Sequence, residues 1–360
     1  MGNPLGIWTL TVSSPRSIAR NAERTEAAGW DGIAVVDSQN LSGDAYVALA
    51  IAASKTERIG IATAVTNPVT RHPAVTAAAI AGLQVYSGGR ATLGIGRGDS
   101  SLAHLGRAPA RVSLLERYVA VLQDYLRGEE VPFEKLDFHE RMAPSVHDLG
   151  LADTPDASRL LWIDDRLPKV QVEVAATGPR VIAAAARTAD RVMFALGAEP
   201  DRIAWGIQEA REARSKAGLD PGEISFGAYV NCVSHPDVTV ARELVSGGLS
   251  TFARFAVMHG SVAGPVSQEQ RRILESLHRA YDMKHHTRVD SPQAKALPPE
   301  FIDRYAVVGP PRDCVARLQE LAALGLERVL IIGPTAGADR TQARLADRTF
   351  VEEVLPAFAG

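Results

Sequence analysis

The sequence has few of the features that mark several large classes of protein. It contains only two cysteines, Cys232 and Cys314, which are far apart and not in a CxxC pattern, so neither a disulfide framework nor a thiolate metal cluster is expected. The formal net charge is −3, which does not suit binding of nucleic acid through a basic surface. No apolar run reaches the roughly 18 residues of a membrane-spanning helix. These absences favour a protein that acts on a small molecule, with no nucleic-acid or membrane partner.

The first residues carry no targeting pattern. The stretch MGNPLGIWTL has no basic segment followed by an apolar one, as a secretory signal would have. We therefore expect a cytoplasmic protein whose two cysteines are reduced.

Short apolar runs alternate regularly with longer alanine-rich amphipathic stretches. This alternation is typical of parallel strands joined by helices. Ser14 and Pro15 are expected to begin one helix, and Gly29, Gly218 and Gly325 to end others in the left-handed conformation. The predicted strands are residues 5–10, 32–37, 59–64, 91–96, 170–176, 191–196, 224–233 and 328–333. These repeated units predict an α/β fold, a (β/α)8 TIM barrel, in a single domain over residues 1–360.

A doubly wound dinucleotide-binding fold is the alternative, because the glycine-rich stretch GIGRGD follows a strand. Its glycines, Gly94, Gly96 and Gly98, lack the GxGxxG spacing and close the fourth unit rather than the first. The barrel is therefore preferred.

Two stretches, residues about 129–168 and 259–306, do not fit the repeat and are predicted insertions after the fourth and seventh strands. Both are rich in proline and polar residues. Three interpretations of these insertions stay open: a lid over the active site, a structural flap and a subunit contact.

In a barrel the active site lies at the carboxyl ends of the strands. After the fifth strand, the turn TGPR runs into a helix whose first backbone N–H groups suit a phosphate; a tight loop that binds nothing is the alternative. After the fourth strand, the glycines would let the backbone come close to a flat ligand. Asp99 there is either a proton-transferring acid or a helix cap, and His104 is expected to be a solvated loop residue.

The segment VTNPVTRHPAV, residues 65–75, is the most unusual connection. Pro68 is expected to stop the third strand. Arg71, His72 and Pro73 then begin the next helix, with Arg71 and His72 in structural rather than catalytic roles.

The stretch YDMKHHTR, with His278 shortly before it, is a candidate metal site. His278, Asp282 and His285 have helical i, i+4, i+7 spacing, but there is no HExxH pattern, and Lys284 and Arg288 would oppose a cation. No metal site is predicted.

The segment VTNPVTRHPAVTAAAIAGLQVYSGGRATLGIGRGDSSLAHLG resembles the central signature of the bacterial luciferase-like flavin and deazaflavin oxidoreductases. Within that superfamily it is most similar to the methylenetetrahydromethanopterin reductase-like branch. The resemblance is strongest over residues 30–106 and continues through VEVAATGPRVIAAAARTADRVMFAL and VVGPPRDCVARLQELAALGLERVLIIGP. It implies a barrel that holds coenzyme F-420, a deazaflavin, or else FMN, at the carboxyl ends of the strands; the TNP motif favours F-420.

The resemblance also implies roles for particular residues. Ala64 and Val65, joined by a non-proline cis peptide bond, would lie under the cofactor's ring. The implied catalytic residues are Asp37, Ser38 and Asp99. The implied cofactor-binding residues are Ala64, Val65, Asn67, Gly96, Thr177, Gly178, Pro179, Arg180, Ala195, Leu196 and Gly197.

The implied activity is hydride transfer between coenzyme F-420 and a small organic substrate, with Asp99 as an acid. A monooxygenase that uses reduced FMN from a separate reductase is the first alternative, and a flavin-binding protein without turnover is the second. A homodimer or higher homo-oligomer is expected. Several alcohol- and sugar-oxidising relatives have a histidine where Ser38 stands, which disfavours oxidation of secondary alcohols.

Overall fold

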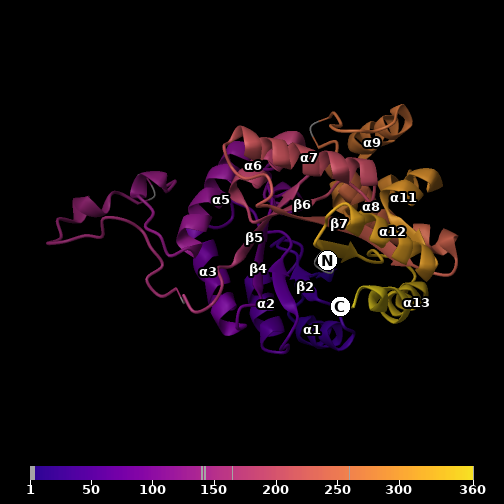
Figure 1. Cartoon of the computed structure of the whole chain (residues 1–360), viewed down its shortest axis with the longest axis horizontal. Coiled ribbons are helices and arrows are strands. Elements are labelled where there is room, and N and C mark those ends of the chain that lie inside the picture. Colours follow the sequence, from indigo (N-terminus) through magenta and orange to yellow (C-terminus); the bar gives the residue numbers. More distant parts are fainter. Residues whose placement is uncertain (1–4, 139–140, 142, 164, 259, 360) are drawn as a thin grey trace.

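Eight parallel strands close into a barrel in this computed structural model, which describes residues 5–138, 141, 143–163, 165–258 and 260–359 (Figure 1). Each strand pairs with its neighbours in parallel, and β9 closes the barrel between β7 and β1. The barrel strands are β1 (Gly6–Thr11), β2 (Gly32–Val35), β3 (Gly60–Thr63), β4 (Ala91–Ile95), β5 (Gln171–Ala176), β6 (Arg191–Phe194), β7 (Ser225–Ser234) and β9 (Arg328–Ile332). The predicted barrel and its eight strands are confirmed, and the dinucleotide-binding alternative is wrong.

One further strand, β8 (Val307–Gly309), was not predicted. It pairs in parallel with Cys232–Ser234 at the carboxyl end of β7. Its three residues extend the sheet beyond the barrel wall.

The helices cover the outside of the barrel (Figure 1). The main ones are α1 (Ile18–Ala27), α2 (Ala45–Ala53), α3 (Pro73–Tyr86), α5 (Val112–Leu126), α6 (Pro179–Thr188), α7 (Pro200–Lys216), α8 (Val238–Phe255), α12 (Pro311–Ala323) and α13 (Arg340–Thr349), which continues through Phe350–Val354 and Leu355–Phe358. After α1, α7 and α12 the predicted glycines, Gly29, Gly218 and Gly325, have φ of 85°, 73° and 96°. The left-handed helix ends are therefore confirmed.

The predicted start of α1 is wrong by three residues. Ser14 does not cap the helix with its side chain; its carbonyl accepts hydrogen bonds from the backbone N–H groups of Ser17 and Ile18. Pro15 to Ser17 form a turn, and the helix begins at Ile18.

Large side chains fill the amino-terminal part of the barrel interior. The ring of Trp8 lies so close to Gly32 and Gly60 that a Cβ on either residue would come within 2.2 and 2.3 Å of it. The Arg328 guanidinium stacks on this ring at 3.9 Å and pairs with Glu173. This end is therefore packed, as barrel interiors are, and the cavity described below lies at the opposite, carboxyl end.

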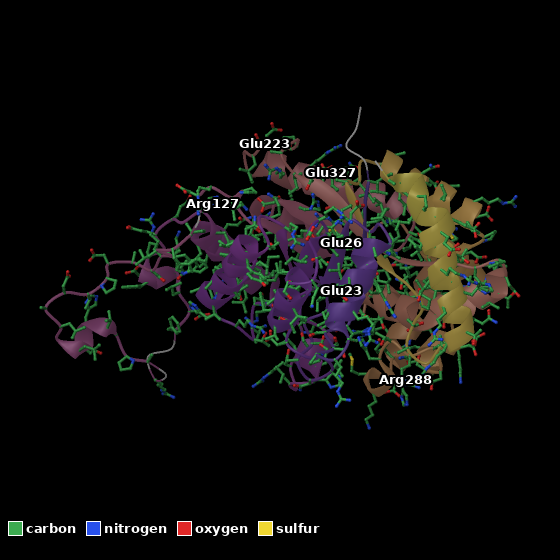
Figure 2. All side chains as sticks on the ribbon, turned by 90° about the horizontal axis from the view of Figure 1, so that it is seen from below. Glu23, Glu26, Arg127, Glu223, Arg288 and Glu327 are labelled. Atoms are coloured by element: carbon green, nitrogen blue, oxygen red, sulfur yellow. The ribbon has the colours of Figure 1, made fainter. Side chains whose placement is uncertain are left out.

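The described part of the first predicted insertion, residues 129–168, projects away from the barrel in Figures 1 and 2. It contains two short 3-10 helices, Phe133–Lys135 and Val146–Leu149. None of its described residues lines the central cavity. The lid, the flap and the subunit contact therefore stay predictions for this insertion.

The second predicted insertion, residues 259–306, packs along α8. It holds α9 (Gln268–Ala280), α10 (Pro292–Lys295) and α11 (Pro299–Tyr305). Two of its described residues, His286 and Thr287, reach the cavity.

The charged side chains labelled in Figure 2 include Arg127, Glu223 and Glu327, which stand near the amino ends of the strands. Cys232 on β7 and Cys314 on α12 are buried, free thiols in the core. No helix among the described residues is both long and apolar enough to cross a membrane.

Candidate active site

A cavity of about 230 Å³ lies at the carboxyl ends of the barrel strands. Its walls combine polar strand ends with apolar side chains from α8 and the barrel. The predicted site residues that line it are Asp37, Ser38, Ala64, Val65, Gly96, Asp99, Thr177 and Ala195. The structure therefore brings together most strand ends that the sequence singled out.

The end of β3 shapes one wall of the cavity. The Ala64–Val65 peptide bond is cis, as the resemblance implied. A Cβ on Gly94 would lie 2.1 Å from the Thr63 carbonyl oxygen, and one on Gly96 would lie 2.9 Å from Val65 Cγ2. Gly96 and Gly98 line the cavity and Gly94 does not, so the interpretation that these glycines admit a flat ligand stays a prediction for the first two.

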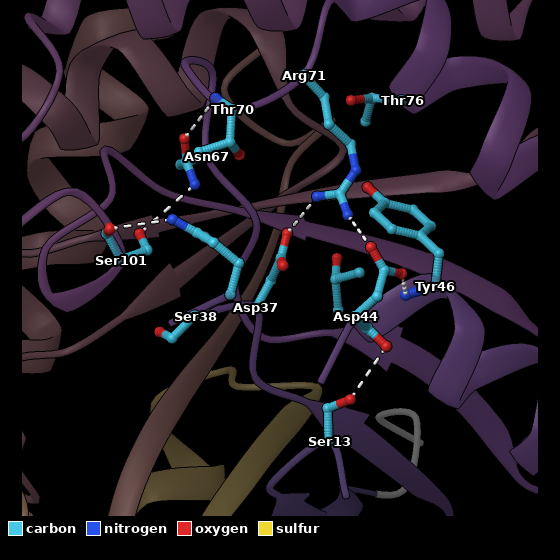
Figure 3. Close-up of polar contacts among 12 residues, drawn as sticks. Ser13, Asp37, Ser38, Asp44, Tyr46, Asn67, Thr70, Arg71, Thr76 and Ser101 are labelled. Atoms are coloured by element: carbon cyan, nitrogen blue, oxygen red, sulfur yellow. Dashed lines mark hydrogen bonds and ion pairs between the residues drawn. The ribbon is translucent and has the colours of Figure 1, made fainter. Parts of the chain in front are cut away.

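Asp37 follows β2 and is only 2% exposed. Its Oδ2 accepts a hydrogen bond of 2.9 Å from Arg71 Nη1, and Arg71 also pairs with Asp44 and stacks over the ring of Tyr46 (Figure 3). The predicted structural role of Arg71 therefore has a physical basis. Asp37 Oδ1 has no hydrogen-bond partner among the described residues, so one oxygen of this cavity-lining carboxylate is left for a ligand.

Asn67 does not line the cavity. It is completely buried, and its Oδ1 accepts hydrogen bonds from the N–H groups of Val69 and Thr70 at 3.0 and 3.1 Å (Figure 3). Its side chain thus fixes the turn after β3. His72 caps α3 by accepting a hydrogen bond from the N–H of Ala74, in line with its predicted structural role.

The turn between β5 and α6 opens toward solvent. Thr177 lines the cavity, whereas Pro179 and Arg180 are exposed beside it. No side chain caps α6, and nothing lies within 4 Å of a Cβ placed on Gly178. The first N–H groups of α6 therefore have room for an anion.

Arg97 adds positive charge near this turn and was not predicted. It lines the cavity, and its Nε donates a hydrogen bond of 2.5 Å to the Ala110 carbonyl. Burial, together with the nearby charge of Arg180, lowers the pKa of Arg97. Two guanidinium groups that repel each other in this way favour an anion between or beside them.

At the end of β6, only Ala195 lines the cavity. Leu196 is completely buried in the main core. Gly197 has a φ of 80°. A Cβ placed on Gly197 would lie only 2.6 Å from the ring of Tyr305. The structure places these two residues in supporting positions rather than on the cavity wall.

Asp99 pairs with Arg254 of α8. It stands at the N-cap position of the short helix α4 (Ser100–Ala103), yet its side chain makes no capping bond, so the helix-cap alternative is wrong. The neighbouring hydroxyl of Ser38 lies 3.2 Å from that of Ser100. The exposed His104 is a loop residue beyond the cavity, as expected.

A hydrogen-bonded chain from the second insertion reaches the cavity. The Tyr281 hydroxyl lies 2.8 Å from His286 Nδ1 and 2.9 Å from the Thr251 hydroxyl, and Arg254 stacks over the Tyr281 ring at 4.5 Å. Burial lowers the pKa of His286 to about 4. His286 is adjacent in sequence to His285, and no sequence signal distinguished them.

His285 instead pairs on the surface with Asp282, at 2.6 Å. The described residues contain no group of three or more side chains that could hold a metal ion.

The chain matches the family model described as "luciferase-like monooxygenase" over residues 3–328. It is 24% identical over 330 residues to a 5,10-methylenetetrahydromethanopterin reductase from Methanolobus tindarius, covering 91% of this chain and 92% of the relative.

Two solved structures share the fold. A coenzyme F-420-dependent tetrahydromethanopterin reductase from Methanopyrus kandleri aligns with a TM-score of 0.70 at 21% identity, covering 99% of this chain and all of the other. An F-420-dependent secondary alcohol dehydrogenase, in complex with an F-420–acetone adduct, aligns with a TM-score of 0.71 at 18% identity, covering 99% of each chain.

Proposed function

The chain belongs to the luciferase-like monooxygenase family, and from this membership we propose that it is an oxidoreductase that transfers a hydride between coenzyme F-420 and a small organic substrate. The observation that carries the proposal is a cavity with an uncapped helix start on one strand end and an unsatisfied carboxylate oxygen on another, among the described residues. The two solved structures described above are both of F-420-dependent enzymes, and this supports F-420 over FMN.

The residues around the cavity fit such a cofactor. Thr177, Gly178, Arg180 and Arg97 would hold its phosphate, because they combine open helix N–H groups with two cations. Asp37 Oδ1 lacks a partner among the described residues and would accept a hydrogen bond from the ring system. When bound, coenzyme F-420 supplies a carbon that donates or accepts the hydride.

The end of β3, together with Ala195 and Gly96 of the cavity wall, completes this assignment. Ala64 and Val65 would form the surface on which the ring lies, and Ala195 lines the cavity near them. Gly96 leaves room for Val65. The remaining positions, Asn67, Leu196 and Gly197, hold the strand ends in place, and Pro179 begins α6.

The chain's own residues would then handle the proton. Asp99 lines the cavity and is oriented by its pair with Arg254, so we assign its carboxylate to hold or pass a proton. The Ser38 hydroxyl is a hydrogen-bonding group in the same wall. The apolar walls exclude water from this chemistry.

An FMN-dependent monooxygenase with a separate reductase is the second candidate. The family's description as a monooxygenase favours it, and the anion-binding turn serves FMN equally well, because FMN also ends in a phosphate. A flavin-binding protein without turnover remains the third.

We further propose a cytoplasmic homo-oligomer. The two neighbouring outer helices α2 and α3 contain no charged residue, although outer barrel helices normally present a polar face. Val47, Val75 and Tyr86 on these helices are exposed. Light scattering coupled to gel filtration measures the number of subunits.

Absorption titrations of purified protein with F-420 and with FMN test the cofactor. Saturable F-420 binding with weaker or no FMN binding supports the proposal. Tight FMN binding without F-420 binding overturns it in favour of the monooxygenase. Binding of neither cofactor overturns all three candidates, and binding without redox turnover against a panel of donors and acceptors favours the third.

A further inference from the structure

We propose that the cavity takes an uncharged substrate with a hydrogen-bond-accepting carbonyl or imine group, and that His286 donates the hydrogen bond to this group from Nε2. The inference rests on the proposed function and deepens it, because it names the class of substrate and a residue that would contact it.

The hydrogen-bonded chain sets the tautomer of His286. Thr251 Oγ1 lies 2.9 Å from the Tyr281 hydroxyl but 3.4 Å from the Gly247 carbonyl, so the shorter contact favours donation from Thr251 to Tyr281. The single hydrogen of Tyr281 then goes to His286 Nδ1, 2.8 Å away. A neutral imidazole that accepts at Nδ1 carries its hydrogen on Nε2.

Nε2 of His286 is available to a ligand. The residue lines the cavity, and no described residue forms a hydrogen bond with Nε2. Burial disfavours the charged imidazole and lowers its pKa to about 4, so the group acts as a neutral donor around neutral pH.

The two carboxylates that line the cavity, Asp37 and Asp99, are already paired with cations. Asp99 is matched by Arg254, and Asp37 by Arg71. Arg97 donates to the carbonyls of Pro109 and Ala110 on the side of Arg180. A charged substrate group placed beside His286 would therefore have to compete with the Asp99–Arg254 ion pair, which is costly, whereas a neutral group would not.

The rest of the wall near α8 is apolar. Phe252, Phe255 and Met258 line the cavity, and the first two rings pack edge to face with centroids 5.3 Å apart. This surface suits the hydrocarbon part of a substrate whose polar group meets His286. The position after Asp37 holds Ser38 and so provides no imidazole. His286 of the second insertion provides an imidazole from another side of the cavity.

Cyclohexanone and cyclohexanecarboxylate are suitable probes, because they share a ring and differ in charge. Each is titrated into protein loaded with whichever cofactor it binds, and the cofactor's absorption is followed. We expect cyclohexanone to bind more tightly than the carboxylate. Tighter binding of the carboxylate, or no saturable binding of the ketone, overturns the proposal.

Variants then assign the donor. His286→Leu is expected to weaken ketone binding about tenfold, as loss of one buried hydrogen bond does, with cofactor affinity unchanged. Tyr281→Phe removes only the hydroxyl that positions His286, so it should weaken ketone binding less than His286→Leu does. His286→Gln should recover part of the ketone affinity that His286→Leu loses. His285→Leu, on the surface, is the matched control. Equal ketone affinity in His286→Leu and the control overturns the role of His286.

Nitrogen NMR of histidine-labelled protein gives a readout that is independent of the cofactor. We expect one neutral histidine, absent in His286→Leu, to be protonated at Nε2 and to shift when cyclohexanone is added. A hydrogen on Nδ1 overturns the proposal. Failure to bind either cofactor would instead count against the proposed function, since the NMR measurement proceeds without one.

Discussion

Arg71 Nη1 lies 2.9 Å from Asp37 Oδ2, and this contact joins the end of β2 to the segment that leads from β3 into α3. The Asp37 side chain is almost fully buried and that of Arg71 is 19% exposed. The pair therefore fixes two neighbouring strand ends of the cavity relative to each other. It also explains why an arginine stands in the connection after β3.

Replacing Arg71 with glutamine should destabilise the protein by about 3 kcal/mol or more, because a buried carboxylate loses its cationic partner. Urea unfolding measures the free energy. Asp44→Asn is the matched control: Asp44 is the exposed partner of Arg71, asparagine also caps helices, and an exposed ion pair contributes about 1 kcal/mol or less. Equal losses in the two variants would contradict the burial argument, whereas Arg71→Gln combined with Asp37→Asn should recover stability.

Replacing Asp99 with asparagine should lower turnover by about a hundredfold, the usual contribution of a proton-transferring group, while cofactor affinity stays nearly unchanged. The change keeps the shape of the side chain beside Arg254. Steady-state kinetics and a cofactor titration provide the two measurements, with surface Asp282→Asn as the control. Unaltered turnover would remove Asp99 from catalysis.

Most of the fold could be predicted from local pattern. Short apolar or β-branched runs between amphipathic stretches identified every barrel strand. Most of these runs are nearly continuous, because parallel strands are buried on both faces, whereas β5 alternates as VQVEVAA. Strand β8 has only three residues, Val307–Gly309, and forms through pairing with β7. Its sequence has no pattern of its own to detect. The start of α1 was missed because a turn precedes the first helical residue.

The candidate site could be predicted only where the barrel itself places residues. Asp37, Val65 and Thr177 directly follow or end strands, so the closed sheet fixes them around the cavity. His286 reaches the cavity from the second insertion, and Arg254 of α8 pairs with the cavity-lining Asp99. Their positions depend on packing between distant segments, which periodicity and spacing do not encode.

Replacing Arg180 with alanine should weaken binding of the phosphate-bearing cofactor about tenfold, as loss of one charge-assisted hydrogen bond does. The remaining affinity should depend less on salt, because exposed charges are screened. Titrations at two salt concentrations measure both effects. Arg187→Ala is the control on the same helix, since Arg187 pairs with Glu116 at the other end of α6. Unchanged affinity would exclude a direct role for the Arg180 side chain.

His286 should make the protein less stable in acid. Its pKa is about 4 in the folded protein, because of burial, against an ordinary value of 6.5. Below pH 6.5 the unfolded chain takes up a proton at this position while the folded one does not. The contribution of the neutral His286 to the free energy of unfolding is therefore fully present above pH 6.5. It is lost as the pH falls toward 4, which lowers the free energy of unfolding by up to about 3 kcal/mol.

His286→Gln removes this titration, so its free energy of unfolding should fall less between pH 7 and pH 4.5 than that of the unaltered protein. Urea unfolding at both pH values measures the difference. The groups that act on His286 are Asp99, which favours its protonation, and Arg254 and His104, which oppose it; all three are retained in the variant. His285→Gln, an exposed neighbour, should keep the full acid sensitivity. An identical fall in His286→Gln would mean that the imidazole titrates normally in the folded state and that water reaches it freely.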